Sequence, residues 1–201
     1  MSDGRFKKVL QTVFTLPHFF SWIIISGIVM NLLNYNGAVN NLLAAIGIEK
    51  IGFLGTPDLF RPLLYASSIW KEAGWGTIIY LAAISSIDPT LYEAAVVDGA
   101  NRFHRIRFIT WPGIQSTVII LLILSVGGVM NAGFDQIFNL YNPTVYDKGD
   151  IIDTYIYRVT FQSIADFGFS TAVGLFKSVI NLTLLLSANR FARLFENGRV
   201  F

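Results

Sequence analysis

The chain of 201 residues contains no cysteine. Without a thiol it has no disulfide, no thiolate metal ligand and no cysteine nucleophile. Cysteine content therefore gives no information about the redox compartment in which the protein works.

Charged residues are scarce as well. They make up 14% of the sequence, against roughly one quarter in an average soluble protein, whereas hydrophobic residues make up 53%. The 17 Phe, 8 Tyr and 4 Trp carry more apolar surface than a disordered chain can leave in water. The net charge is only +2, and the 15 Lys and Arg residues are scattered along apolar sequence, so we expect no nucleic-acid partner.

The sequence also lacks the common motifs of enzyme sites. It contains no H-E-x-x-H, no G-x-S-x-G and no G-x-x-x-x-G-K pattern, and its two histidines, His18 and His104, lie on different segments. Gly74-Trp75-Gly76 does not extend to G-x-G-x-x-G and lies in an apolar stretch, where helix packing is its expected role. We predict no catalytic residue, no metal site and no cofactor in this chain, so any ATP must bind to another chain.

Four apolar stretches are long enough to cross about 30 Å of hydrocarbon as helices. They lie at about 13–33, 62–87, 113–134 and 169–188. The second is the least typical, because Lys71 and Glu72 lie in its middle. We predict an all-α transmembrane bundle with four spans, forming a single domain over 1–201.

Two alternatives to this interpretation are a cleaved signal peptide and a soluble helical core. The basic N-terminus and first apolar stretch resemble a signal peptide, but no small-x-small cleavage pattern follows and Met30-Asn31-Leu32 continues the stretch. A soluble all-helical core could also be apolar on every side. Four such segments with alternating loop charge argue against it.

Basic residues in short loops set the orientation. Nine basic residues lie before the first span, between the second and third spans, and after the fourth span. They are Arg5, Lys7 and Lys8; Arg102, Arg105 and Arg107; and Arg190, Arg193 and Arg199. The other loops hold only Lys50, Arg61, Lys148 and Arg158, with several aspartates. The sequence therefore predicts that both termini and the loop at 88–112 face the cytoplasm.

The loop at 88–112 is the most informative segment. Asp88 can cap a helix that begins with Pro89, and Gly99 can adopt the positive φ that ends a helix. A second helical turn is expected from Asn101, and Pro112 is expected to begin the third span. The pattern predicts a short, rigid projection.

These residues resemble the cytoplasmic signature of binding-protein-dependent ABC importer permeases, which reads E-A-A, three residues, Gly, nine residues, Ile, one residue, Leu-Pro. The matching positions are Glu93, Ala94, Ala95, Gly99, Ile109 and Pro112, and Trp111 replaces the leucine. Asp98 and Ala100 in YEAAVVDGA are similar to the carbohydrate branch. The stretches WKEAGWGTIIYLAA and DIIDTYIYR resemble permeases of oligosaccharide and polysaccharide-fragment importers.

The resemblance implies a type I importer permease of the bacterial cytoplasmic membrane that works by alternating access. It implies that residues 93–100 form a coupling helix that docks on a separate ATPase, which would hold ATP and Mg. Further implied partners are a second permease subunit, an extracytoplasmic solute-binding protein, the oligosaccharide substrate and membrane lipid. Permeases of this branch usually have two more spans before the segment that opens this chain, so a truncated product, a fragment or a deviant member is expected.

Two other functions remain open at this point. The loop could be an ordinary amphipathic helix resting on the membrane. The chain could also be an integral-membrane enzyme or a scaffold whose loop recruits a different protein.

Ionisable groups inside a bilayer are functional candidates, so Lys71 and Glu72 are predicted to line the substrate path, although they could simply pair with other spans. Trp75 could stack on a sugar ring or anchor its helix. The resemblance to sugar permeases adds Ser125 and Asn131 as expected substrate contacts. Lys177 and Asn181, spaced i and i+4, are weaker candidates that could serve packing.

Overall fold

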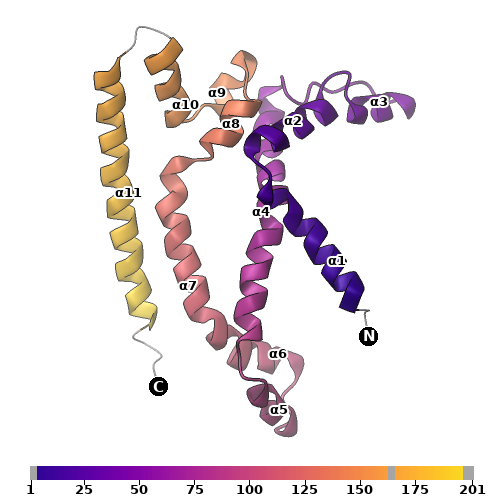
Figure 1. Cartoon of the computed structure of the whole chain (residues 1–201), viewed down its shortest axis with the longest axis vertical. Helices are drawn as coiled ribbons and strands as arrows, with labels where there is room; N and C mark the ends of the chain where they lie inside the picture. Colours follow the sequence, from indigo (N-terminus) through magenta and orange to yellow (C-terminus); the bar gives the residue numbers. More distant parts are fainter. Residues whose placement is uncertain (1–3, 163–165, 197–201) are drawn as a thin grey trace. The chain divides into compact units, whose positions relative to one another are not determined.

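The computed structural model describes residues 4–162 and 166–196, and within these ranges every regular element is helical (Figure 1). The principal helices are α1 (Gly4–Thr15), α2 (Trp22–Leu33), α3 (Ala38–Ala45), α4 (Pro57–Ser85), α5 (Pro89–Val97), α6 (Arg102–Arg105), α7 (Trp111–Gly128), α8 (Phe134–Leu140), α9 (Tyr146–Gly149), α10 (Ile152–Tyr157) and α11 (Phe167–Glu196). Contacts divide the chain into two compact units. Unit 1 comprises 1–75 and 131–171, and unit 2 comprises 76–130 and 172–201.

The first predicted span is interrupted, so the expectation of one continuous helix over 13–33 was wrong. Helix α1 ends at Thr15, a 3-10 turn η1 (Leu16–Phe19) follows, and Phe20 is extended with ψ 143°. Pro17 lacks the N–H that a continuing helix would need. Ser21 then caps a new helix, since its hydroxyl accepts a hydrogen bond from Ile24 N at 3.4 Å.

The core of unit 1 forms where α2, α4 and α8 meet. Its buried side chains are Ile25, Val29, Phe60, Leu63, Leu140 and Val145. Gln136 on α8 is also buried, and its amide nitrogen donates to the Leu64 carbonyl at 2.7 Å and to the Ser67 hydroxyl at 2.9 Å. Apolar burial and these paired polar groups together hold α8 against the first half of α4.

Three segments of the described residues are long and apolar enough to cross a membrane: Trp22–Ala45, Arg102–Asn131 and Phe167–Ala192. The all-α transmembrane fold is thus confirmed, but with three such segments where four were predicted. Helix α4 has 29 residues and a length of about 43 Å, which would be sufficient. It is not among these three segments, because the charged Lys71 and Glu72 at its centre lower its mean hydropathy.

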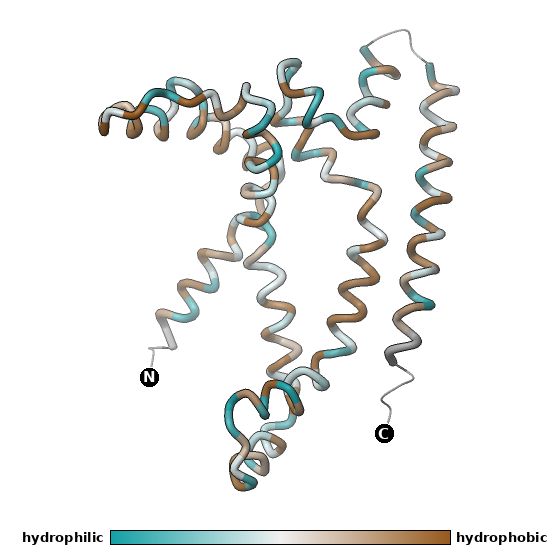
Figure 2. Tube along the Cα trace, turned by 180° about the vertical axis from the view of Figure 1, so that it is seen from behind, coloured by the Kyte–Doolittle hydropathy of each residue, from teal (hydrophilic) through white to brown (hydrophobic). Residues whose placement is uncertain are grey.

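Unit 2 contains the second part of α4, the α5–α6 connection, α7 and α11. A π-helical segment η2 (Ile106–Thr110) joins α6 to α7, so the third span starts earlier than predicted. Figure 2 shows an almost unbroken apolar stretch along α7. Gly127 on α7 lies close to α11, since a Cβ there would stand 3.2 Å from the Leu185 side chain. The prediction of a single domain over 1–201 remains a prediction.

Candidate functional site

The segment 86–113, here called the α5 loop, begins with a capped helix. The Asp88 carboxylate accepts a hydrogen bond from Thr90 N at 2.9 Å, and Pro89 is the first residue of α5. Hydrogen bonds from the Thr90 backbone and side chain lower the pKa of Asp88 below its usual value. The start of α5 therefore forms as its sequence predicts, with a negative charge at the positive end of the helix dipole.

The end of α5 closes in a Schellman motif. Gly99 adopts φ 76°, its N–H donates to the Val96 carbonyl at 3.1 Å, and Ala100 N–H donates to the Ala95 carbonyl at 2.8 Å. These two bonds satisfy carbonyls that would otherwise lack partners at the helix end. Asn101 then caps α6, since its side chain accepts a hydrogen bond from His104 N at 2.9 Å.

Two contacts tie α5 and the residues before it to η2 and the first turn of α7. The hydroxyls of Tyr92 and Thr110 are hydrogen-bonded at 2.9 Å. At the base of the loop, Gly113 leaves so little room that a Cβ there would stand 2.6 Å from the Ile87 side chain. Because α5 is capped at both ends and bonded to η2, it is held on α7 as a rigid projection.

The predicted signature residues lie on this projection. Glu93, Ala94, Asp98 and Gly99 are exposed, Ala95 and Ala100 are half-buried, Ile109 is half-buried in η2, and Pro112 is exposed in the first turn of α7. Apolar side chains of α5 are exposed beside them: Leu91 by 53%, Val96 by 56% and Val97 by 87%. A capped helix with exposed small and apolar residues presents a surface suited to close contact with another protein.

A second group of predicted residues gathers in unit 1, around the middle of α4. Lys71 is buried, and its ammonium donates to the His18 carbonyl at 2.6 Å and lies 3.8 Å from a Glu72 carboxylate oxygen. The other Glu72 oxygen lies 2.8 Å from His18 Nδ1. We call His18, Lys71, Glu72 and Trp75 the α4 polar cluster.

His18 was not predicted as a site residue, yet it connects the cluster. Its ring stacks on Trp75 with centroids 4.7 Å apart and an interplanar angle of 1°. One face of the Trp75 indole is therefore covered by a side chain of this chain. A histidine within an otherwise uncharged apolar stretch was the signal that could have identified it.

Close backbone contact places His18 in this position. A Cβ on Gly74 would stand 2.0 Å from the Phe14 carbonyl oxygen and 2.7 Å from Thr15 N. Only glycine therefore allows α1 and η1 to lie this close to α4.

The other predicted path residues lie on α7, on α11 and in a 3-10 turn. Ser125 is exposed on α7 in unit 2, where its hydroxyl donates to the Leu121 carbonyl of its own helix at 2.8 Å. Asn131 is exposed in a 3-10 turn (Val129–Asn131) at the start of the second segment of unit 1. Lys177 and Asn181 lie on α11 in unit 2. Within unit 1, the structure thus groups Lys71, Glu72 and Trp75 of the predicted path in the α4 polar cluster.

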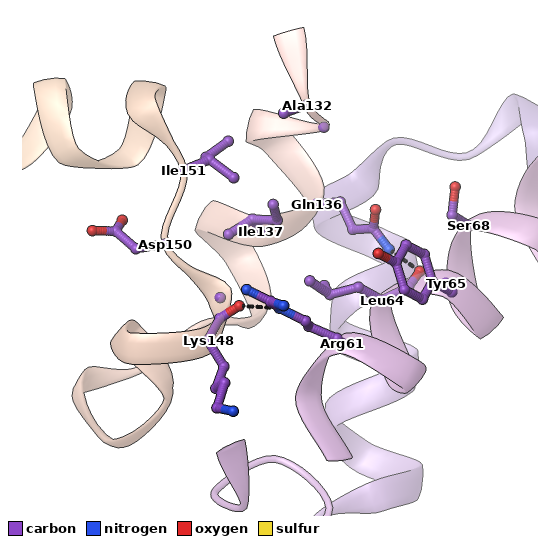
Figure 3. A pocket seen from close by; sticks show the side chains of 12 residues that line it. Arg61, Leu64, Tyr65, Ser68, Ala132, Gln136, Ile137, Lys148, Asp150 and Ile151 are labelled. Atoms are coloured by element: carbon purple, nitrogen blue, oxygen red, sulfur yellow. Dashed lines mark hydrogen bonds between the residues drawn. The ribbon is translucent and has the colours of Figure 1, made fainter. Parts of the chain in front are cut away.

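Unit 1 also contains a pocket of about 460 Å³ that the sequence did not predict, here called the Arg61 pocket (Figure 3). One face of α4 contributes Arg61, Leu64, Tyr65 and Ser68, and the remaining lining residues are Ala132, Gly133, Gln136, Ile137, Lys148, Gly149, Asp150 and Ile151. In Figure 3 the Arg61 side chain extends from α4 toward the segment 148–151. Its Nε donates to the Lys148 carbonyl at 2.6 Å.

An ion pair stabilises the far wall of this pocket. Arg158 forms two hydrogen bonds with the Asp150 carboxylate, one of them at 2.9 Å, and its guanidinium lies 4.3 Å from the Tyr146 ring centroid. Burial alone would raise the pKa of Asp150, but hydrogen bonds from Arg158 and Thr154 outweigh it and leave this pKa below its usual value. The same bond to Asp150 raises the pKa of Arg158. Asp150 is therefore fully ionised and fully engaged at neutral pH.

No group of three or more His, Cys, Asp or Glu residues that could hold a metal ion occurs in residues 4–162 and 166–196. Asp150 instead pairs with Arg158, Glu72 lies 3.8 Å from Lys71, and Asp88 caps α5.

Comparison with known proteins identifies the family. Residues 2–198 match the model of the binding-protein-dependent transport system inner membrane component. The chain is 45% identical over 197 residues to the polygalacturonan/rhamnogalacturonan transport system permease protein YteP of Bacillus subtilis, an alignment that covers 98% of this chain and 61% of the relative. It is 43% identical to the protein LplB of the same organism, covering 98% and 62%. The chain thus spans about three fifths of the length of these relatives.

Solved structures agree with the sequence relatives. A bacterial ABC transporter involved in the import of the acidic polysaccharide alginate superposes with a TM-score of 0.89 at 45% identity, covering 96% of this chain and 67% of that chain. A second crystal structure, of an alginate ABC transporter in complex with an alginate pentasaccharide-bound periplasmic protein, gives a TM-score of 0.87 at 43% identity, covering 97% and 68%. With three apolar segments and a match along nearly its whole length, the chain belongs to the family of inner-membrane components of binding-protein-dependent transport systems.

Proposed function

We propose that this chain is the membrane-spanning permease subunit of an ABC importer for oligosaccharides, in particular fragments of acidic polysaccharides. It moves its substrate by alternating access, together with a second permease subunit and an extracytoplasmic solute-binding protein. ATP and Mg are bound by separate ATPase subunits, so the chain itself is not an enzyme. Both termini and the α5 loop face the cytoplasm.

The observation that carries this proposal is the construction of the α5 loop. A permease that is driven by another subunit needs a stiff element that transmits movement as a rigid body. Helix α5 is capped by Asp88, closed by Gly99 and bonded to η2 through Tyr92. Its exposed face combines Glu93 with small and apolar side chains, which suits docking in a cleft of an ATPase.

The substrate class rests on a different kind of support. Related proteins are named for the transport of polygalacturonan/rhamnogalacturonan and alginate, and both kinds of polymer carry carboxylates. Lys71, Glu72 and Trp75 supply polar and aromatic groups on α4, and Ser125 and Asn131 remain proposed contacts further along the chain. Because His18 covers one face of Trp75, that face cannot stack on a sugar ring as well.

The coupling role is tested by co-purification of the ATPase subunit with matched pairs of variants. Gly99→Ala and Gly47→Ala place the same side chain at nearly equal φ, 76° and 80°, so both strain the backbone similarly. Glu93→Lys and Glu49→Lys reverse the same charge at exposed positions.

We expect the ATPase to be lost from the complex with Gly99→Ala and Glu93→Lys and retained with Gly47→Ala and Glu49→Lys. Retention in all four variants would contradict the coupling role. Uptake of radiolabelled trigalacturonate by cells with and without this gene tests the substrate class separately.

A further inference from the structure

The proposed transport function makes no use of the Arg61 pocket. We propose that this pocket binds one acidic sugar residue of the substrate, with its carboxylate on the Arg61 guanidinium and its ring against Tyr65. The inference rests on the proposed function, because it assigns the recognition of a substrate that the importer would carry.

The charges around the pocket favour an anion. Arg61 uses Nε to bind the Lys148 carbonyl, and within residues 4–162 and 166–196 no carboxylate pairs with its two terminal nitrogens. Lys148 lies 3.5 Å from Asp58, and Asp150 is engaged by Arg158. Arg61 is therefore the uncompensated charge of the pocket.

The geometry of Arg61 suits a carboxylate in particular. The bond from Nε to a backbone carbonyl fixes the plane of the guanidinium, and the two terminal nitrogens remain as a planar pair of donors. Such a pair matches the two oxygens of a carboxylate, which a lysine ammonium cannot do.

The neighbouring residues on α4 suit the ring of a sugar. Tyr65 follows Arg61 by one helical turn and Ser68 follows by two, so all three project from the same face of α4. The Tyr65 side chain is 67% exposed. An exposed aromatic ring beside a hydroxyl and a cation offers an apolar surface and polar contacts at once, as sugar rings require.

A buried acceptor completes the pocket. Gln136 is only 6% exposed, and its amide nitrogen donates one hydrogen bond to the Leu64 carbonyl and one to the Ser67 hydroxyl. Its Oε1 accepts no hydrogen bond from the described part of the chain and faces Gly133, where a Cβ would stand 3.5 Å away. An amide oxygen held in place by two bonds of its own nitrogen is preorganised to accept a sugar hydroxyl.

The backbone at the rim is unusual as well. Ala132 lines the pocket with φ 41°, a left-handed conformation that costs a residue other than glycine about 1 kcal/mol or more. Together with Gly133 at φ 73° it turns the chain into α8, which carries Gln136. The cavity volume of about 460 Å³ lies within the range of small-ligand sites.

The test compares two trisaccharides that differ only at C6 of each ring: trigalacturonate, which carries carboxylates, and α-1,4-galactotriose, which carries hydroxymethyl groups. Equilibrium dialysis measures their binding to the complete membrane complex purified without its solute-binding protein. The variants are Arg61→Gln, Arg61→Lys and Tyr65→Ala, with Lys50→Gln as a control that removes a cation outside the pocket.

Arg61→Gln is expected to weaken the binding of trigalacturonate about tenfold or more, the effect of losing a charge-assisted hydrogen-bonded pair, and to leave galactotriose binding unchanged. Arg61→Lys should restore part of the loss, Tyr65→Ala should weaken both sugars, and Lys50→Gln should change neither. The binding of trigalacturonate should also fall as salt is raised.

Two results would overturn the inference: equal binding of trigalacturonate by Arg61→Gln and the parent complex, or no binding of either sugar by the parent complex. If the intact importer nevertheless takes up trigalacturonate in cells, the proposed function stands and only the role of the pocket fails. If cells import no oligosaccharide through this transporter, the proposed function itself fails.

Discussion

Replacing Gly74 with alanine is expected to separate α1 from α4. The added Cβ would stand 2.0 Å from the Phe14 carbonyl oxygen, 2.4 Å from the Phe14 carbonyl carbon and 2.7 Å from Thr15 N. All three are backbone atoms, so no side-chain rotation can relieve the contact. The two segments must move apart by about 1 Å or more to reach ordinary van der Waals distances.

The magnitude follows from two opposing effects. Forced overpacking costs about 3 kcal/mol at the upper end of its usual range, and replacing a helical glycine with alanine returns about 1 kcal/mol. The net loss of about 2 kcal/mol corresponds to a fall in Tm of roughly 4–8 °C for a chain of this size. Gly76 is the matched control, because a Cβ there meets no described atom within 4 Å.

Thermal unfolding of the detergent-solubilised protein measures both variants. Gly74→Ala should lower Tm, whereas Gly76→Ala should raise it by about 1–4 °C. Since His18 moves with α1 and η1, Gly74→Ala should also lower oligosaccharide uptake. Equal or increased Tm in Gly74→Ala would refute the argument that close backbone contact positions the α4 polar cluster.

Three further predictions follow from the contacts of single side chains. Asp150→Asn should destabilise the protein by about 1–2 kcal/mol at neutral pH. Because folding lowers the pKa of Asp150, the stabilisation by its carboxylate is complete above the unfolded pKa near 3.8 and is lost as the pH falls below that value. The unfolding curves of the parent and the variant should therefore converge in acid. A stability difference that stays constant with pH would contradict the prediction. Lys71→Met keeps the side-chain volume but leaves the His18 carbonyl without its donor, so the free energy of unfolding by denaturant should fall by about 1–3 kcal/mol. An unchanged denaturation midpoint would contradict a stabilising role of the α4 polar cluster. Asp88→Ala removes the cap of α5, so amide hydrogen exchange in α5 should accelerate while exchange in α7 stays constant. An unchanged exchange rate of the Thr90 amide would contradict the capping role of Asp88.

Local signals in the sequence predicted the α5 loop almost completely. The residues that cap or turn a backbone act on neighbours two to five positions away, so Asp88, Gly99 and Asn101 specify their conformations without help from distant segments. The length of the apolar stretches likewise predicted helices for α7 and α11. The first span shows the limit of such rules, because Pro17 alone does not reveal that Ser21 begins a separate helix.

The two polar sites of unit 1 depend on contacts that no local rule contains. His18 meets Glu72 across 54 residues, Arg61 meets the Lys148 carbonyl across 87, and Gln136 meets Ser67 across 69. Lys71 and Glu72 could be selected as costly charges in an apolar stretch, but their partner could not be named. The Arg61 pocket remained unpredicted because its residues come from α4 and from the segment 132–151.

Cysteine cross-linking at α5 tests the importer proposal most directly, because the chain has no native cysteine and a single introduced thiol is unambiguous. Val97 is 87% exposed on α5 and Leu42 is 69% exposed on α3. In native membranes, Val97→Cys should cross-link to an ATP-hydrolysing subunit, and Leu42→Cys should not. A cross-link to the ATPase from Leu42→Cys, or none from Val97→Cys, would contradict the assignment of the α5 loop as the coupling element.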